Sequence, residues 1–152
     1  MTRAHLILTA TLGSAALLAG AFLFQAFGYA PCHLCLLQRW PHAAAIVIGA
    51  LALVTGLRAL PYLGAAAALT TAGLGLYHTG VERQWWEGPT TCTSGSIAGV
   101  DPKALLDQIL AAPIVRCDDV AWQLMGLSMA SWNMLASLVL AGIWIAAARK
   151  RA

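Results

Sequence analysis

Two cysteines separated by two residues offer the most reactive chemistry in this sequence. Cys32 and Cys35 form a Cys-X-X-Cys motif directly after Pro31, and Arg39 lies four residues beyond Cys35. This spacing closes a small ring and is typical of disulfides that open and re-form. If the segment is helical, both cysteines and Arg39 share one face, where the guanidinium could stabilise negative charge on a reacting thiolate. A helix start after Pro31 would also favour a thiolate through the helix dipole.

The other two cysteines, Cys92 and Cys117, lie far apart in the sequence. A bond between them would close a loop of about 25 residues, which chain-entropy models value at roughly 3 kcal/mol. Taken alone, this pair is therefore expected to be a structural disulfide.

Three kinds of site are compatible with the Cys-X-X-Cys motif: a zinc site, a structural disulfide and a redox-active dithiol. Zinc usually takes four clustered ligands from two closely spaced pairs, and Cys92 and Cys117 do not supply a second short spacing. A thioredoxin fold is excluded because no βαβ pattern surrounds the motif. We favour a redox dithiol at a membrane boundary and keep the other two sites as alternatives.

A histidine is expected at the same depth as Arg39. Arg39 lies 19 residues before Arg58, and His78 lies 17 residues after Pro61, on the two sides of a predicted turn. A titratable imidazole beside a redox carrier could deliver protons, although such a histidine is also common as a simple interfacial group. A haem protein with His42 and His78 as axial ligands is a weaker alternative because it leaves the cysteines unexplained.

The composition decides which elements position these residues. Of 152 residues, 60% are hydrophobic and only 10% are charged, whereas soluble domains carry about 25% charged residues. The nine basic residues are scattered among hydrophobic runs, which argues against a nucleic-acid partner. We predict an all-α membrane protein with one domain over residues 1–152. Its bundle of four transmembrane helices is expected at about 6–27, 40–57, 60–78 and 124–147.

The distribution of charge predicts the orientation. With both termini in the cytoplasm, that side holds Arg3, Arg58 and the basic cluster 149–151, and no acidic residue joins them. Loops at about 28–39 and 81–121 then face the oxidising side with all four cysteines. Within the long loop, Asp101 begins a predicted short amphipathic helix, which either packs in the loop or lies on the membrane surface.

Several motifs occur together in a fixed order along the chain. They are Pro31-Cys32-His33-Leu34-Cys35-Leu36-Leu37-Gln38-Arg39, Tyr77-His78, Cys92, Arg116-Cys117-Asp118, Trp122 and Gly126. This series closely resembles the disulfide bond formation protein B (DsbB) family of bacterial inner-membrane proteins. The resemblance covers essentially the whole chain, and its Pro-Cys-X-X-Cys-X-X-Gln-Arg run is specific.

The resemblance implies a protein-disulfide:quinone oxidoreductase with its cysteines in the periplasm. Such a protein would reoxidise a periplasmic thiol oxidase of the DsbA type and pass the electrons to a membrane quinone, ubiquinone or menaquinone. It would thereby sustain disulfide bond formation without a metal. The long-loop pair then becomes functional rather than structural.

The same resemblance assigns a role to each site residue. Cys92 would be attacked by the partner and Cys117 would be its disulfide mate. Cys32 would exchange with the loop pair, and Cys35 would face the quinone. The quinone-contacting residues would be Arg39 and, less directly, His78.

Two other functions compete with this one. A quinone-linked enzyme of the vitamin K epoxide reductase type usually carries its Cys-X-X-Cys motif late in the chain, whereas here the motif comes first. A non-catalytic membrane scaffold with two structural disulfides is the alternative from a different class.

Overall fold

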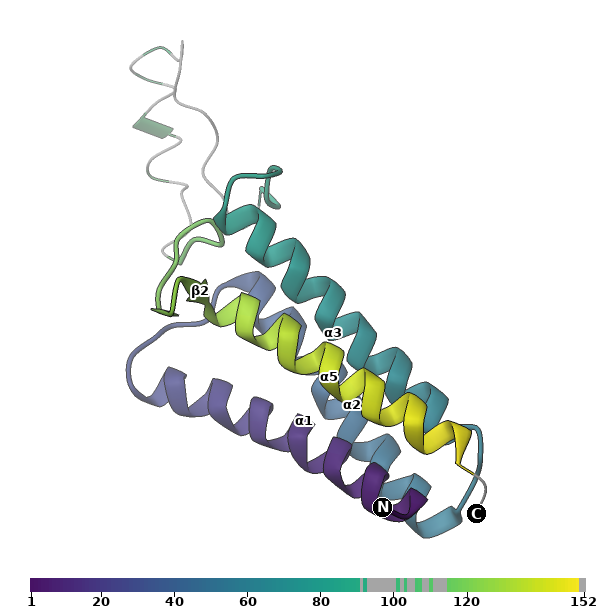
Figure 1. The fold of residues 1–152 in the computed structure, drawn as a ribbon. Helices are drawn as coiled ribbons and strands as arrows, with labels where there is room; N and C mark the ends of the chain where they lie inside the picture. Colours follow the sequence, from purple (N-terminus) through teal and green to yellow (C-terminus); the bar gives the residue numbers. More distant parts are fainter. Residues whose placement is uncertain are drawn as a thin grey trace.

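The computed structural model describes residues 1–90, 92, 101, 103, 106–107, 110 and 115–150. Within these residues the chain forms four long helices and one short hairpin. The elements are α1 (Arg3–Ala26), α2 (His33–Thr55), α3 (Leu60–Glu82), β1 (Gln123–Leu124), β2 (Leu127–Ser128) and α5 (Met129–Arg149). The helices lie side by side in an elongated bundle, and both termini lie at the end opposite β2 (Figure 1). The expected all-α class is confirmed for this part of the chain, apart from the hairpin.

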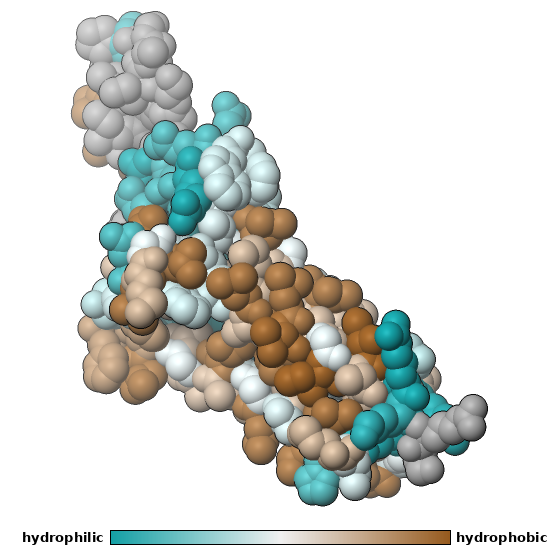
Figure 2. Space-filling model, viewed as in Figure 1, coloured by the Kyte–Doolittle hydropathy of each residue, from teal (hydrophilic) through white to brown (hydrophobic). Residues whose placement is uncertain are grey.

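Three of the four helices, α1, α2 and α5, are long and apolar enough to cross a membrane. Hydrophobic side chains extend along the bundle and hydrophilic ones gather towards its two ends (Figure 2). Exposed leucines and valines of this kind are stable facing lipid, whereas a soluble protein would bury most of them.

The helix α3 has the same length as α2, 23 residues, but is not among the three candidate spans. It packs against both α2 and α5. Its buried residues include glycine and alanine together with Thr71, His78 and Thr79. These small and polar side chains serve contacts between helices rather than contacts with lipid.

The start of α2 differs from the prediction. The helix begins at His33, not near residue 40, so the predicted loop 28–39 contracts and the Cys-X-X-Cys motif becomes the first turn of the helix. Cys32 is the N-cap, and its sulfur accepts a hydrogen bond from the Cys35 amide at 3.3 Å. Pro41 is accommodated inside α2, where it removes one backbone donor without ending the helix. The predicted start near residue 40 was therefore too late in the sequence.

The last helix also begins later than expected, at Met129 rather than near residue 124. The preceding residues form the hairpin β1–β2, in which Leu124 pairs with Leu127 across Met125 and Gly126. Both turn residues have positive φ, 53° and 75°, which is the backbone conformation of a two-residue type I′ turn. Gly126 adopts a positive φ without steric cost because it has no Cβ. The hairpin occupies residues 123–128, so the last helix can begin only after it.

The helices pack closely at the end of the bundle where both chain termini lie. Trp144 is fully buried there, and its ring lies against Gly64, where an added Cβ would come within 2.6 Å of a ring carbon. Arg3 donates to the carbonyl oxygens of Gly56 and Leu57, at 3.1 and 2.8 Å. These contacts tie the first helix to the turn between α2 and α3.

The short helix predicted after Asp101 lies largely outside the described residues. Among those that are described, the Asp101 carboxylate accepts a hydrogen bond from the Lys103 amide at 3.0 Å. A bond of this kind is typical of a helix N-cap, and the short helix itself stays a prediction.

Candidate active site

The four cysteines gather at the hairpin end of the bundle. Cys92 and Cys117 form a disulfide, and both are buried. Cys32 and Cys35 are free thiols, with their sulfur atoms 2.9 Å apart. Cys32, Cys92 and Cys117 belong to one buried cluster with Leu34 and Val81, and Cys35 packs against it. The long-loop disulfide and the dithiol are therefore packed together, although their cysteines lie between 57 and 85 residues apart in the sequence.

The surroundings of Cys32 favour the neutral thiol over the thiolate. Its side chain shares a hydrogen bond with Cys35, and this bond, together with burial, raises the pKa of Cys32 well above its ordinary value. A thiolate at Cys32 therefore needs a donor that appears or strengthens during the reaction.

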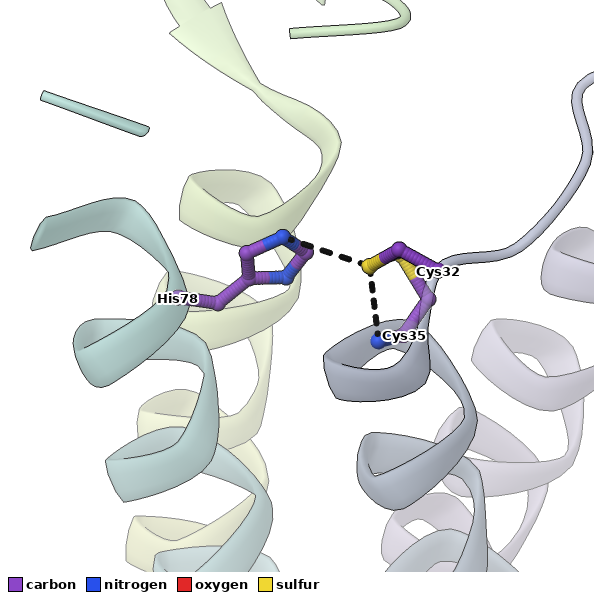
Figure 3. A group of neighbouring side chains, drawn as sticks. All are labelled: Cys32, Cys35 and His78. Carbon is purple, nitrogen blue, oxygen red and sulfur yellow. Dashed lines mark hydrogen bonds between the residues drawn. The ribbon is translucent and has the colours of Figure 1, made fainter. Parts of the chain in front are cut away.

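His78 is the closest titratable neighbour of the dithiol. Its Nε2 lies 3.5 Å from the Cys32 sulfur, and the imidazole of α3 points across to the start of α2 (Figure 3). The Glu82 carboxylate, one turn later on α3, lies 3.8 Å from the same nitrogen. The ligand atoms of Cys32, Cys35 and His78 lie within 4.8 Å of one another, so by distance these three could hold a soft metal ion.

A chain of buried polar groups continues from His78 into the bundle. Gln38 Nε2 lies 3.0 Å from His78 Nδ1, and Gln38 Oε1 accepts from Asn133 at 2.8 Å. Asn133 also contacts Thr71 Oγ1 at 3.2 Å and His42 Nε2 at 2.9 Å. These residues join α2, α3 and α5 beneath the dithiol.

Sequence reasoning overlooked Gln38, Thr71 and Asn133 as site residues. The available signal was that Gln38 and His42 are polar, four residues apart and hence on one face of an otherwise apolar helix. In Asn133 an amide interrupts the last apolar stretch, where a polar group needs a partner.

A cavity of about 390 Å³ opens beside the dithiol. Apolar residues of α1 and the hairpin region line much of it. Its polar and reactive lining comes from Cys32, Cys35, Gln38, Arg39, His42, His78, Glu82, Arg116, Asp119 and Asn133. A mostly apolar cavity with a few convergent polar groups is typical of a site for a small organic ligand.

Arg39 bridges α2 and α1 at the side of this cavity. Its Nη1 donates to Gln25 Oε1 at 2.8 Å and its Nη2 donates to the Ala21 carbonyl at 3.3 Å, while the guanidinium lies 4.8 Å from the Phe22 ring centroid. Its Nε is buried and has no partner within the described residues. The side chain is therefore fixed in place with part of its donor capacity unused.

Known proteins resemble this chain in a way that agrees with the geometry. The model of one family, described as disulfide bond formation protein DsbB, matches residues 3–147. The chain belongs to the DsbB family.

Other comparisons add less. An uncharacterized protein of Rickettsia prowazekii (strain Madrid E), RP370, is 29% identical over 120 residues, which cover 75% of this chain and 69% of the relative. No solved structure matches the chain significantly. Membership of the DsbB family makes the chain a membrane oxidoreductase that serves disulfide formation.

The sequence-predicted site residues of this DsbB-family chain are all found at one end of the bundle. Cys32, Cys35 and His78 are in direct contact, and Arg39 joins them as lining of the cavity. Arg39 and His78 line the same cavity; the similarity of their depths and the roles of these residues stay predictions.

Paired charges flank Cys117 of this DsbB-family chain. Arg116 forms an ion pair with Asp118, one residue on each side of Cys117, and a longer one with Asp119 at 3.5 Å. The pairing raises the pKa of Arg116 and lowers the pKa of Asp118. Both charges are therefore retained at neutral pH, next to the cysteine that closes the loop.

Proposed function

We propose that this chain is a protein-disulfide:quinone oxidoreductase that reoxidises a periplasmic thiol oxidase of the DsbA type. The observation that carries the proposal is a free dithiol packed between a disulfide and a largely apolar cavity. A soluble dithiol would deliver electrons on one side of this arrangement, and a lipid-soluble acceptor would remove them on the other.

We further propose a single membrane domain over residues 1–152 in the bacterial inner membrane. α3 is taken as the fourth span, because it packs along α2 and α5 over the same length. Both termini lie at one end of the bundle and are assigned to the cytoplasm, and the cysteine end is assigned to the periplasm (Figure 1).

Electrons enter through the loop pair. A partner thiolate attacks Cys92, forms a mixed disulfide and releases Cys117 as a thiolate. The second partner thiol then displaces Cys92, so the partner leaves oxidised and the loop pair is left reduced. One disulfide has formed in the partner and one has broken here.

Electrons then pass inward to the dithiol. A loop thiolate attacks the sulfur of Cys32 in a Cys32–Cys35 disulfide and releases the Cys35 thiolate beside the cavity. The other loop thiolate re-forms the Cys92–Cys117 bond and releases Cys32. The product has a closed loop pair and an open inner pair, which is the arrangement of the described structure.

The residues around the cavity fit a quinone. The volume accommodates a substituted ring, the lining by α1 suits an isoprenoid chain, and the Arg39 side chain brings a positive charge to the lining. A bound quinone, ubiquinone or menaquinone, would supply a two-electron, two-proton acceptor. Arg39 would stabilise the negative charge that leaves the Cys35 sulfur, and His78 would hold or move a proton at its Nε2.

The test is quinone consumption by the purified protein in detergent with a reduced DsbA-type protein. We expect one quinone lost for each partner disulfide formed, and no turnover in Cys32→Ala or Cys35→Ala. Absence of turnover with both ubiquinone and menaquinone analogues, by a folded protein with its loop disulfide intact, would favour the non-catalytic scaffold.

A further inference from the structure

The hydrogen bonds among the buried polar side chains beneath the dithiol can be assigned donors and acceptors, because two backbone carbonyl oxygens take part in them. Gln38 places one amide atom 3.1 Å from the Leu34 carbonyl oxygen. A carbonyl oxygen only accepts, so this atom is the NH₂ group of Gln38. The same NH₂ group lies 3.0 Å from His78 Nδ1 and therefore donates to it. His78 Nδ1 must then be the bare nitrogen of the ring.

A second anchor fixes the opposite end of the chain. The Thr71 hydroxyl donates to the backbone carbonyl oxygen of Gln38 at 3.1 Å, so its oxygen is left to accept from Asn133. The Asn133 NH₂ group thus donates both to Thr71 and to Gln38 Oε1. Both anchors give the same orientation for the two amides, and reversing either amide would place two acceptors or two donors against each other.

The direction determines which nitrogen of His78 carries the proton. With Nδ1 occupied as an acceptor, the neutral ring is protonated at Nε2. That nitrogen lies 3.5 Å from the Cys32 sulfur, within range of an N–H···S contact, whereas the Glu82 carboxylate at 3.8 Å is beyond hydrogen-bond range. The backbone of Cys117 is a further hydrogen-bond partner of the imidazole. His78 thus presents a donor to Cys32 rather than a lone pair.

We propose that Gln38, backed by Asn133 and Thr71, is a positioning residue that holds His78 as the Nε2–H tautomer, so that the imidazole stabilises the Cys32 thiolate. The proposal rests on the proposed function, since the thiolate arises in the internal exchange.

The step concerned is the second half of that exchange. A loop thiolate attacks its partner loop sulfur in the mixed disulfide with Cys32, one S–S bond forms in the loop, and the bond to Cys32 breaks. The bonding pair leaves on the Cys32 sulfur, towards His78 Nε2–H. The loop pair is oxidised and the inner pair is reduced, so no further oxidant is needed. A donor at this sulfur lowers the basicity of the leaving group and accelerates its departure.

The first experiment observes the tautomer directly. Nitrogen NMR of the full-length protein, labelled with ¹⁵N-histidine in detergent, distinguishes the protonated from the bare ring nitrogen, with Cys32 and Cys35 reduced and the imidazole neutral. We expect His78 as Nε2–H in the wild type, and a mixture of tautomers in Gln38→Leu. A wild-type His78 protonated at Nδ1, or an unchanged Nε2–H in Gln38→Leu, overturns the proposal.

The second experiment measures the internal exchange without quinone, so that binding in the cavity does not enter. Fully oxidised protein is mixed with one equivalent of dithiothreitol, quenched with acid, alkylated, and analysed by mass spectrometry for the appearance of the Cys32–Cys35 dithiol. We expect Gln38→Leu to slow this appearance about tenfold, because a hydrogen bond to a charged group is lost. Asn133→Leu should act in the same direction and less strongly.

Ser131→Ala is the matched control. Ser131 bonds Thr79 at 3.0 Å and so joins the same two helices, α3 and α5, without touching His78 or Gln38. Its exchange rate and His78 tautomer should equal those of the wild type. If Gln38→Leu changes the His78 tautomer but not the rate at which the Cys32–Cys35 dithiol appears, the tautomer has no role in the internal exchange and the proposal is overturned. Failure of the wild type to exchange, with His78 as Nε2–H, would instead refute the proposed function.

Discussion

Replacing Arg39 with lysine tests most directly whether the cavity binds a quinone. The substitution keeps the positive charge but removes the two separate N–H donor groups of the guanidinium. The guanidinium already gives one nitrogen to Gln25 and another to the Ala21 carbonyl, and it still lines the cavity. A lysine ammonium has a single nitrogen, which cannot donate to the oxygen atoms of α1 and to a ligand in the cavity at the same time. At least one charge-assisted hydrogen bond is therefore lost on quinone binding.

The expected size of the effect follows from that count. One hydrogen bond to a charged group contributes about 1.5–3 kcal/mol, which corresponds to roughly 10- to 150-fold in an equilibrium constant. Because Arg39 is only partly buried, solvent screening places the expected loss near the lower end. We expect kcat/KM for a ubiquinone analogue to fall about tenfold in Arg39→Lys, mainly through KM.

The assay is quinone reduction at varied quinone concentration, with saturating reduced DsbA-type partner. Arg3→Lys is the matched control, because Arg3 makes the same kind of two-nitrogen fork to carbonyl oxygens at the other end of the bundle. Its kinetics should not change. If Arg39→Lys reduces quinone with wild-type KM and kcat, Arg39 only ties α2 to α1 and the assignment of the cavity is refuted.

Two further outcomes are expected. Cys35→Ala should abolish quinone reduction, while the Cys32 thiolate can still attack the Cys92–Cys117 disulfide, form a mixed disulfide with one loop cysteine and release the other as a thiolate. Non-reducing mass spectrometry after proteolysis detects this species; normal turnover would contradict the assignment of Cys35 to the cavity side. Gly64→Ala should lower the unfolding free energy by about 1–3 kcal/mol, since the new methyl group meets the buried Trp144 ring. Gly73→Ala, which meets open space, should not lower it; equal thermal stability of the two variants would show that Trp144 moves aside freely.

The sequence predicted the helices better than their ends. Long apolar stretches specify a helix in a membrane, so four helices were expected and four are found in the described residues. The start of α2 was misplaced because the charged Arg39 was taken as the limit of the apolar stretch, whereas the helix is begun by the Cys32 cap and runs through Arg39 and Pro41. The hairpin at Gly126 was missed because a two-residue turn carries almost no hydrophobic pattern.

The residues of the candidate site likewise fall into those that the sequence identified and those that it did not. Cys32, Cys35, Arg39 and His78 were identifiable because their types are reactive and their spacing sets their depth. The amide chain through Asn133 was not identifiable, since it depends on which faces of α2, α3 and α5 meet, and residue spacing within one helix does not determine that.

The coexistence of one closed and one open cysteine pair sets how many electrons a single molecule can retain. In the described state the loop pair is oxidised and the inner pair reduced, so the molecule already holds two electrons and has room for two more. Under the proposed function, a cell whose membrane quinone pool is suddenly reduced would not lose thiol oxidation at once. Each molecule would accept one further pair, and the residual oxidation would be stoichiometric with the amount of this protein rather than with the size of the quinone pool.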